Sequence, residues 1–300
     1  MPTPSESLPP SASEPRGRAL AILGAGVMGE TVLSGLLRAG WAPAEIVATD
    51  RRPERRAELT QTYGIRMLEN TEAVAAANTI ILVVKPQDMN DLLGEIAGVL
   101  DPGTLVVSLA AGVDTASIED QLPAGTAVVR VMPNTPAQVD EGMAAISPGS
   151  HTTQQDLDQV SEILSATGRV VTVPERYQDA VTALSGSGPA YLFFVVESMI
   201  EAGVHLGLPR DIATELVVQT MLGSAKLLRE TGEHPTVLRE RVTSPGGTTA
   251  AAVRQLEDHK VRAAFIGAIE AARDRSRDLA AAARDDRRSR PAQRNGSAPA

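Results

Sequence analysis

The sequence changes its pattern near Pro174, and this change constrains the fold more than any other feature. Before that residue, short aliphatic and β-branched runs alternate with stretches of helical periodicity, and after it strand patterns are absent. Strands that are apolar on consecutive residues are typical of a parallel sheet covered by helices on both faces. The sequence therefore predicts a Rossmann-like, doubly wound α/β domain followed by an all-α domain.

The boundaries follow from the same patterns. The predicted strands cover residues 19–23, 45–49, 79–84, 104–109, 127–131, 143–147 and 169–173, with a helix at 153–166. Beyond them, helices are expected within 179–206, from Pro209 to 229, at 235–241 and 248–257, and from about 260. We expect a dinucleotide-binding domain at 18–174 and a helical dimerisation and substrate domain at 175–283. The Pro/Ser-rich residues 1–17 and the Arg-rich residues 284–300 are expected to be disordered.

Composition excludes several classes of function. A net charge of −9 argues against a nucleic-acid partner, and the absence of cysteine excludes disulfides and thiolate catalysis. There is no uninterrupted run of about 18 apolar residues and no secretory signal pattern, so we expect a cytoplasmic protein without a membrane span. The four histidines are scattered without metal-ligand spacing, and no metal site is predicted.

A glycine-rich loop follows the first predicted strand and opens a helix. Its GxGxxG spacing allows a tight turn, close approach of a pyrophosphate and close packing of helix on strand. In this βαβ context it predicts a dinucleotide site formed by Leu23, Gly24, Ala25, Gly26, Val27, Met28 and Gly29.

The end of the second predicted strand carries conflicting signals for cofactor choice. Asp50 suits the ribose hydroxyls of NAD, whereas Arg51 and Arg52 suit the 2′-phosphate of NADP. We favour phosphate contact by Arg51 and Arg52, because guanidinium groups bind phosphate in a bidentate manner. Arg55 and Arg56 are interpreted instead as part of a solvated helix face balanced by glutamates.

Two further strand ends lie at the carboxyl edge, where open α/β sheets bind ligands. Because Pro86 makes the first of these a turn, Lys85 is expected to contact the cofactor through its backbone rather than act as an acid. The predicted cofactor contacts at these ends are Val83, Val84, Lys85, Pro86, Leu109, Ala110 and Ala111.

A second glycine-containing loop, VTSPGGTT at residues 242–249, precedes an alanine-rich helix. Its glycines let the backbone approach a ligand, and the N–H groups of a helix N-terminus attract an anion. It offers hydroxyls but no strong acid, base or nucleophile, which suits a small anionic substrate whose chemistry depends on a cofactor. An ordinary Ser/Thr N-cap is the alternative for any single residue. The predicted substrate contacts are Ser244, Gly246, Gly247, Thr248 and Thr249.

Two other features of the helical half have competing interpretations. SGSGP at residues 185–189 departs from the GxSxG pattern of a hydrolase and introduces a helix. The helix at 190–200 is apolar on nearly every side, so it needs extensive burial. An intrachain core is one explanation, and we favour a buried subunit interface because a small all-α half has little interior.

Four motifs follow one another along the chain: GAGVMGE at 24–30, VKP at 84–86, ALSGSGPAY at 183–191 and VTSPGGTT at 242–249. RVMPNTPA at 130–137 adds a fifth. In these motifs and their order the chain resembles the pyrroline-5-carboxylate reductases. The resemblance covers residues 18 to about 275. It implies a helical domain that interlocks with a second subunit, substrate pockets built from both chains of a homodimer, and further assembly such as a decamer.

The resemblance also implies roles for individual residues. The family's adenine-ribose asparagine falls on Asn70, its carboxylate-binding N–H groups on Thr248 and Thr249, and the hydroxyl near the imine nitrogen on Thr249. A position where some members have a cofactor-contacting asparagine is Arg241 here. Thr249 is accordingly the predicted catalytic residue.

The activity that we expect is NAD(P)H-dependent reduction of 1-pyrroline-5-carboxylate to L-proline, with NADPH favoured over NADH. Another imine or hydroxyacid reductase of similar build is one alternative, although hydroxyacid enzymes place a lysine on the interdomain helix and residues 191–205 contain none. A noncatalytic dinucleotide-sensing module is another alternative, and it would not need the VTSPGGTT loop.

Overall fold

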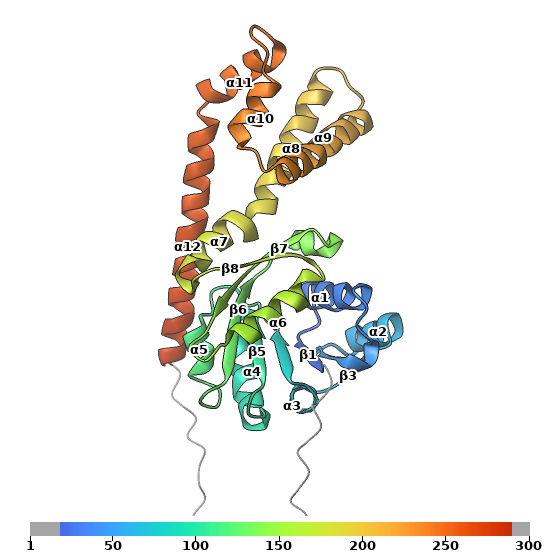
Figure 1. Ribbon diagram of the computed structural model, residues 1–300, viewed down its shortest axis with the longest axis vertical. Coiled ribbons are helices and arrows are strands. Elements are labelled where there is room, and N and C mark those ends of the chain that lie inside the picture. Colours follow the sequence, from blue (N-terminus) through green and yellow to red (C-terminus); the bar gives the residue numbers. More distant parts are fainter. Residues whose placement is uncertain (1–18, 290–300) are drawn as a thin grey trace, which may run out of the picture. The chain divides into compact units, whose positions relative to one another are not determined.

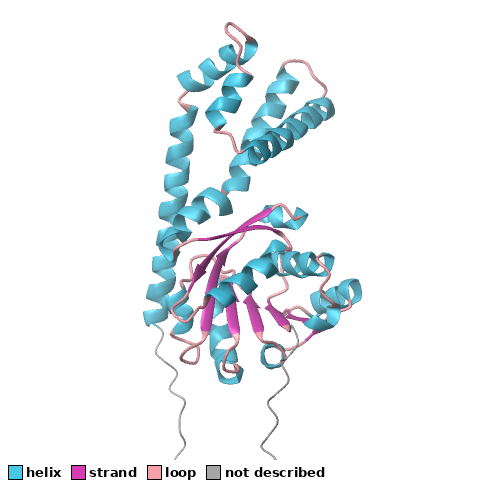
Figure 2. Cartoon of the chain, viewed as in Figure 1, coloured by secondary structure: helices cyan, strands magenta, loops and turns pink. Residues whose placement is uncertain are grey.

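The computed structural model describes residues 19–289 (Figures 1 and 2). Within this range the chain divides into a unit that contains the sheet, built on residues 19–175, and a helical unit built on residues 176–281. The tail predicted at 1–17 lies outside the described residues, as do residues 290–300 of the tail predicted at 284–300.

The first unit is built on one eight-stranded sheet with the order β3-β2-β1-β4-β5-β6-β7-β8. All neighbouring strands are parallel except β6 and β7, which are antiparallel. The predicted doubly wound fold is confirmed. The strands are β1 Leu20–Leu23, β2 Ile46–Thr49, β3 Arg66–Met67, β4 Thr79–Leu82, β5 Leu105–Ser108, β6 Ala127–Met132, β7 Gly142–Pro148 and β8 Gly168–Thr172. Only β3 was not predicted, because two residues make no apolar run.

Helices cover both faces of this sheet (Figure 2). They are α1 Val27–Arg38, α2 Pro53–Tyr63, α3 Asn70–Ala75, α4 Met89–Ile96, α5 Thr115–Glu119 and α6 Gln154–Ser165. Alternate strand residues belong to two separate cores. Leu20 and Ile22 pack in the cluster that includes residues of α1, α2 and α6, whereas Ala21 and Leu23 pack with α3, α4 and α5.

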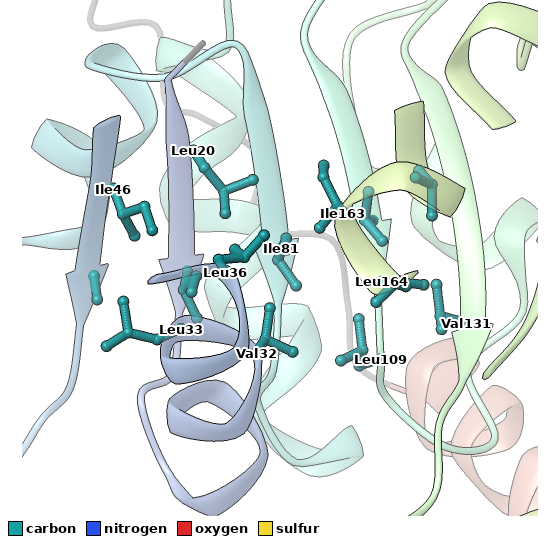
Figure 3. Close-up of a cluster of buried hydrophobic side chains, with 14 of the residues drawn as sticks. Leu20, Val32, Leu33, Leu36, Ile46, Ile81, Leu109, Val131, Ile163 and Leu164 are labelled. Atoms are coloured by element: carbon teal, nitrogen blue, oxygen red, sulfur yellow. The ribbon is translucent and has the colours of Figure 1, made fainter. Parts of the chain in front are cut away.

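Figure 3 shows the first of these clusters. Val32, Leu33 and Leu36 of α1 lie beside strand residues that include Leu20 and Ile81, and all five side chains are at most 2% exposed. Full burial of such a side chain stabilises a fold by about 1.5–3 kcal/mol. The sheet unit therefore has a large aliphatic core, despite the scarcity of aromatic residues.

The helical unit contains α7 Gln178–Val181, a π-helical turn at Thr182–Gly186, α8 Gly188–His205, α9 Arg210–Thr231, α10 Pro235–Arg241 and α11 Thr248–Asp258, followed by α12 Val261–Ser289. Pro209 is the N-cap of α9, not a first-turn residue as predicted. The helix α12 also continues beyond the predicted start of the tail at 284. Its last nine residues, AAARDDRRS at 281–289, contain three alanines and three arginines, which have high helix propensity.

Apolar side chains of the helical unit are largely exposed in the single chain. Phe193 and Phe194 of α8 are 67% and 69% exposed, and only a few residues of this unit, such as Ala183 and Ala213, are fully buried. The stretch Glu175–His205 is long and apolar enough to cross a membrane, judged by length and composition alone. One such helix is weak evidence for a span, because helices that are buried in a soluble protein pass the same test.

Candidate active site

The glycine-rich loop connects β1 to α1 at the carboxyl edge of the sheet. Gly24 has a φ of +100°, which favours glycine, and a Cβ there would lie 2.8 Å from the Val83 carbonyl oxygen. A Cβ on Gly29 would lie 2.3 Å from the Gly24 carbonyl oxygen, whereas one on Gly26 would meet nothing within 4 Å. Gly24 and Gly29 are thus required by close packing, while Gly26 leaves open space for a ligand.

Strand order explains why this loop lies at a binding site. β1 lies between β2 and β4. After β1 the chain adds β2 and β3 on one side of it, and then crosses over to add β4 on the other side. Loops on either side of such a switch point separate and leave a crevice. The N–H groups of Gly24 and Ala25 both donate to the Thr49 carbonyl at the end of β2, at 3.2 and 2.8 Å, and so hold the loop against that strand.

A cleft of about 440 Å³ opens at this switch point. It contains predicted cofactor contacts from four separate segments of the chain. These are Gly24, Gly26, Arg51, Arg52, Asn70, Val83, Val84 and Lys85. Residues between positions 24 and 85 of the sequence are thereby gathered at one edge of the sheet, where a dinucleotide is expected to bind.

The predicted phosphate-binding arginines are both paired with carboxylates. Arg52 binds Asp50 through Nε and Nη2, at 3.0 and 3.1 Å, and its backbone N–H also donates to Asp50. Arg51 makes a single longer contact of 3.4 Å with Asp88, and its side chain is 73% exposed. Burial alone would raise the pKa of the Asp50 carboxyl, but the hydrogen bonds from Arg52 outweigh burial and lower this pKa. Asp50 is therefore engaged by Arg52, whereas Arg51 is held weakly.

Other predicted contacts lie around the same cleft or behind it. The Asn70 amide, at the start of α3, donates to Glu95 at 2.9 Å. Lys85 precedes a short 3-10 turn at Pro86–Asp88, so the predicted turn is present, and the contact of its backbone with the cofactor stays a prediction. Five of the remaining predicted contacts are buried, so only their backbone atoms or the shape of the loop can affect a ligand: Leu23, Ala25, Gly29, Leu109 and Ala110. Three are exposed, namely Val27, Pro86 and Ala111, and Met28 is half-buried. None of these nine residues lines the cleft.

Several residues that line the cleft were not predicted. Four of them are acidic, and the set is Thr49, Leu68, Glu69, Gln87, Asp88, Asp91, Leu92 and Glu95. Asp88 lies two residues beyond Pro86, and its position in the turn after β4 could have identified it as a residue of the cleft. Glu95 gave none, because only the packing of α4 beside α3 brings it to Asn70.

The interpretation of Arg55 as part of a solvated helix face is wrong. Its side chain is only 14% exposed, and its Nε donates to the Ala25 carbonyl at 3.2 Å. Arg56 differs, because it pairs with Glu69 near the surface. Arg55 and Arg56 are neighbours in α2, and one step along a helix turns a side chain by about 100°, so the two side chains point in different directions.

The VTSPGGTT loop leads into α11. Gly246 has a φ of +70°, and a Cβ on Gly247 would lie 2.4 Å from Ser244 Oγ. Gly247 is the N-cap, with no side chain capping the helix, and the first helical hydrogen bond is donated by Ala251 to Gly247. The N–H groups of Thr248, Thr249 and Ala250 therefore precede that bond, in the position where helices bind anions.

Two family models match different parts of the chain, and relatives that match most of its length identify one family. A family described as pyrroline-5-carboxylate reductase dimerisation matches residues 175–279, and one described as NADP oxidoreductase coenzyme F420-dependent matches residues 19–112. The pyrroline-5-carboxylate reductase of Corynebacterium melassecola is 46% identical over 264 residues, covering 87% of this chain and 98% of that protein. The chain belongs to the pyrroline-5-carboxylate reductase family.

Solved structures of pyrroline-5-carboxylate reductases have the same fold. The structure from Coxiella burnetii has a TM-score of 0.84 at 34% identity and covers 87% of this chain and 98% of that one. The structure from Plasmodium falciparum, which has NADP bound, has a TM-score of 0.79 at 27% identity, with coverages of 88% and 99%. The predicted resemblance to pyrroline-5-carboxylate reductases is confirmed, and the dimerisation region supports assembly into an oligomer.

Proposed function

We propose that the chain catalyses NAD(P)H-dependent reduction of 1-pyrroline-5-carboxylate to L-proline. The observation that carries this proposal is the presence of two anion-binding loops in one member of this family. One is the glycine-rich loop beside the cleft, and the other is the VTSPGGTT loop at the start of α11. We assign the first role to a dinucleotide-binding domain at 18–174 and the second to a helical dimerisation and substrate domain at 175–283.

The substrate is assigned to the VTSPGGTT loop. The N–H groups of Thr248 and Thr249 donate to its carboxylate, with Ser244, Gly246 and Gly247 shaping the approach. Thr249 is half-buried and Thr248 exposed in the single chain. The Thr249 hydroxyl is assigned to the imine nitrogen, which makes Thr249 the catalytic residue.

A reduced nicotinamide bound at the glycine-rich loop would supply the hydride for reduction of the cyclic C=N bond. An imine that arrives protonated needs no strong acid from the protein, so the residues of the loop act by orienting it. A net charge of −9 gives no overall attraction for an anionic substrate, and the local N–H groups must provide it.

NADPH is the favoured cofactor, with NADH as the alternative. Arg51 is the more available partner for a 2′-phosphate, because among the described residues it contacts one carboxylate, that of Asp88, at 3.4 Å. Asp50, which would accept hydrogen bonds from the ribose hydroxyls of NADH, already accepts them from Arg52. Both observations favour the phosphorylated cofactor.

We assign the exposed apolar surface of α8 to a homodimer interface, with a decamer as the further assembly. A second chain of the same kind supplies the burial that Phe193 and Phe194 lack in one chain. This assignment also accounts for the apolarity of Glu175–His205 without a membrane. A cytoplasmic location and the absence of a nucleic-acid partner remain part of the proposal.

Two other functions predict different results. A hydroxyacid reductase is disfavoured because α8, GPAYLFFVVESMIEAGVH, contains no lysine. A dinucleotide-sensing module would bind cofactor but would not reduce NADP⁺ when proline is added at high pH.

Replacement of Thr249 by valine tests the catalytic assignment. The variant keeps the β-branched shape and the N–H group but lacks the hydroxyl, and one lost hydrogen bond lowers kcat/KM by about 3- to 100-fold. Cofactor affinity is expected to stay unchanged, and Thr248→Val, the matched control, should have a smaller effect. The measurement is steady-state kinetics with pyrroline-5-carboxylate. Wild-type kinetics would remove Thr249 from the mechanism, and complete inactivity of a folded variant would indicate obligatory proton donation.

A further inference from the structure

Arg55 of α2 is bound from three directions behind the glycine-rich loop. Nε donates to the Ala25 carbonyl at 3.2 Å, Nη1 donates to Glu58 at 2.8 Å, and Nη2 donates to Glu30 of α1. Glu30 also accepts a hydrogen bond of 2.9 Å from the Tyr63 hydroxyl. These contacts join α2, α1 and the loop through one guanidinium group.

The contact with Ala25 determines how one peptide group faces. Ala25 is 1% exposed, its N–H donates to Thr49, and its carbonyl accepts from Arg55. A trans peptide is planar, and its C=O and N–H groups point in opposite directions. A cation that holds the Ala25 carbonyl on the α2 side therefore holds the Gly26 N–H on the opposite side.

Arg55 does not itself line the cleft, whereas Gly26 does. We propose that Arg55 is a positioning residue for the dinucleotide, which fixes the Ala25–Gly26 peptide with its N–H group facing the pyrophosphate. This inference depends on the proposed function only in taking a dinucleotide as the ligand. Arg55 serves NADPH and NADH equally, because both contain the pyrophosphate, and in this respect it differs from Arg51 and Arg52.

The test is the binding of two small ligands to Arg55→Met in the full-length chain. ADP contains the pyrophosphate, whereas adenosine 2′-monophosphate does not. Loss of a hydrogen bond to a charged group weakens binding of ADP, NADPH and NADH by about 10-fold or more. Binding of adenosine 2′-monophosphate should change by less than about 2-fold, and kcat at saturating cofactor by a similarly small factor.

Arg56→Met is the matched control, because it removes the same charge from the same helix and breaks a contact with Glu69 at the cleft but none with the glycine-rich loop. It is expected to change ADP binding by less than about 2-fold, because it leaves the Ala25–Gly26 peptide held by Arg55. The proposal is overturned if Arg55→Met binds ADP as the wild type does, if both small ligands weaken equally, or if Arg56→Met has the same effect.

If Arg55→Met does not fold, the same binding measurements are made on Arg55→Lys. Lysine keeps the charge but cannot contact three acceptors with a planar fork, so ADP should weaken by a smaller factor, about 3-fold. Equal changes for ADP and adenosine 2′-monophosphate would overturn the proposal here as well. Failure of the wild type to bind any dinucleotide would instead count against the proposed function.

Discussion

A fragment of residues 18–177 is expected to fold and bind dinucleotide but to show no reductase activity. All eight strands lie between Leu20 and Thr172, and the buried residues of both cores lie between residues 20 and 164. The VTSPGGTT loop is absent from the fragment. Circular dichroism, titration with NADPH and an assay with pyrroline-5-carboxylate measure the three properties separately.

The end of this fragment matters because of Glu175. Its carboxylate accepts hydrogen bonds of 2.8 Å from the Thr115 backbone and hydroxyl, and it pairs at 3.4 Å with Arg130, whose side chain is 8% exposed. A matched fragment that ends at 174 leaves Arg130 without this partner and should be less stable. Turnover by either fragment would contradict the assignment of the substrate to the helical domain.

Replacement of both Arg51 and Arg52 by alanine is expected to weaken NADPH binding by on the order of 30- to 1000-fold, from the loss of two charge-assisted contacts. NADH affinity should barely change, because NADH lacks the 2′-phosphate. Titration of each cofactor against the double variant and the two single variants measures the effect.

The single variants separate the two arginines. Arg51→Ala should account for most of the loss, since Arg51 is the less firmly paired of the two. Arg52→Ala frees Asp50 and should preserve or improve NADH binding. Equal losses for both cofactors would show that these arginines act structurally.

The fold was predictable because its signals are local. Consecutive apolar residues marked the strands at Leu20–Leu23 and Thr79–Leu82, and the spacing of Gly24, Gly26 and Gly29 marked the turn between β1 and α1. Such patterns depend on neighbours in sequence, which the sequence displays directly.

The rest of the site depends on contacts between distant residues. The burial of Arg55 depends on the rotation of α2 against α1, and its partner Glu30 lies 25 residues away. The pairing of Arg51 with Asp88 spans 37 residues. The end of α12 was missed for a different reason, because its charges were taken as a sign of disorder while its alanines and arginines favour a helix.

The most direct test is a spectrophotometric assay of the full-length chain with 1-pyrroline-5-carboxylate and each reduced cofactor. The proposed function predicts oxidation of NADPH only when the imine is present, formation of proline in equal amount, and slower or weaker turnover with NADH. A folded protein that binds NADPH but does not oxidise it in the presence of 1-pyrroline-5-carboxylate would contradict the proposed function.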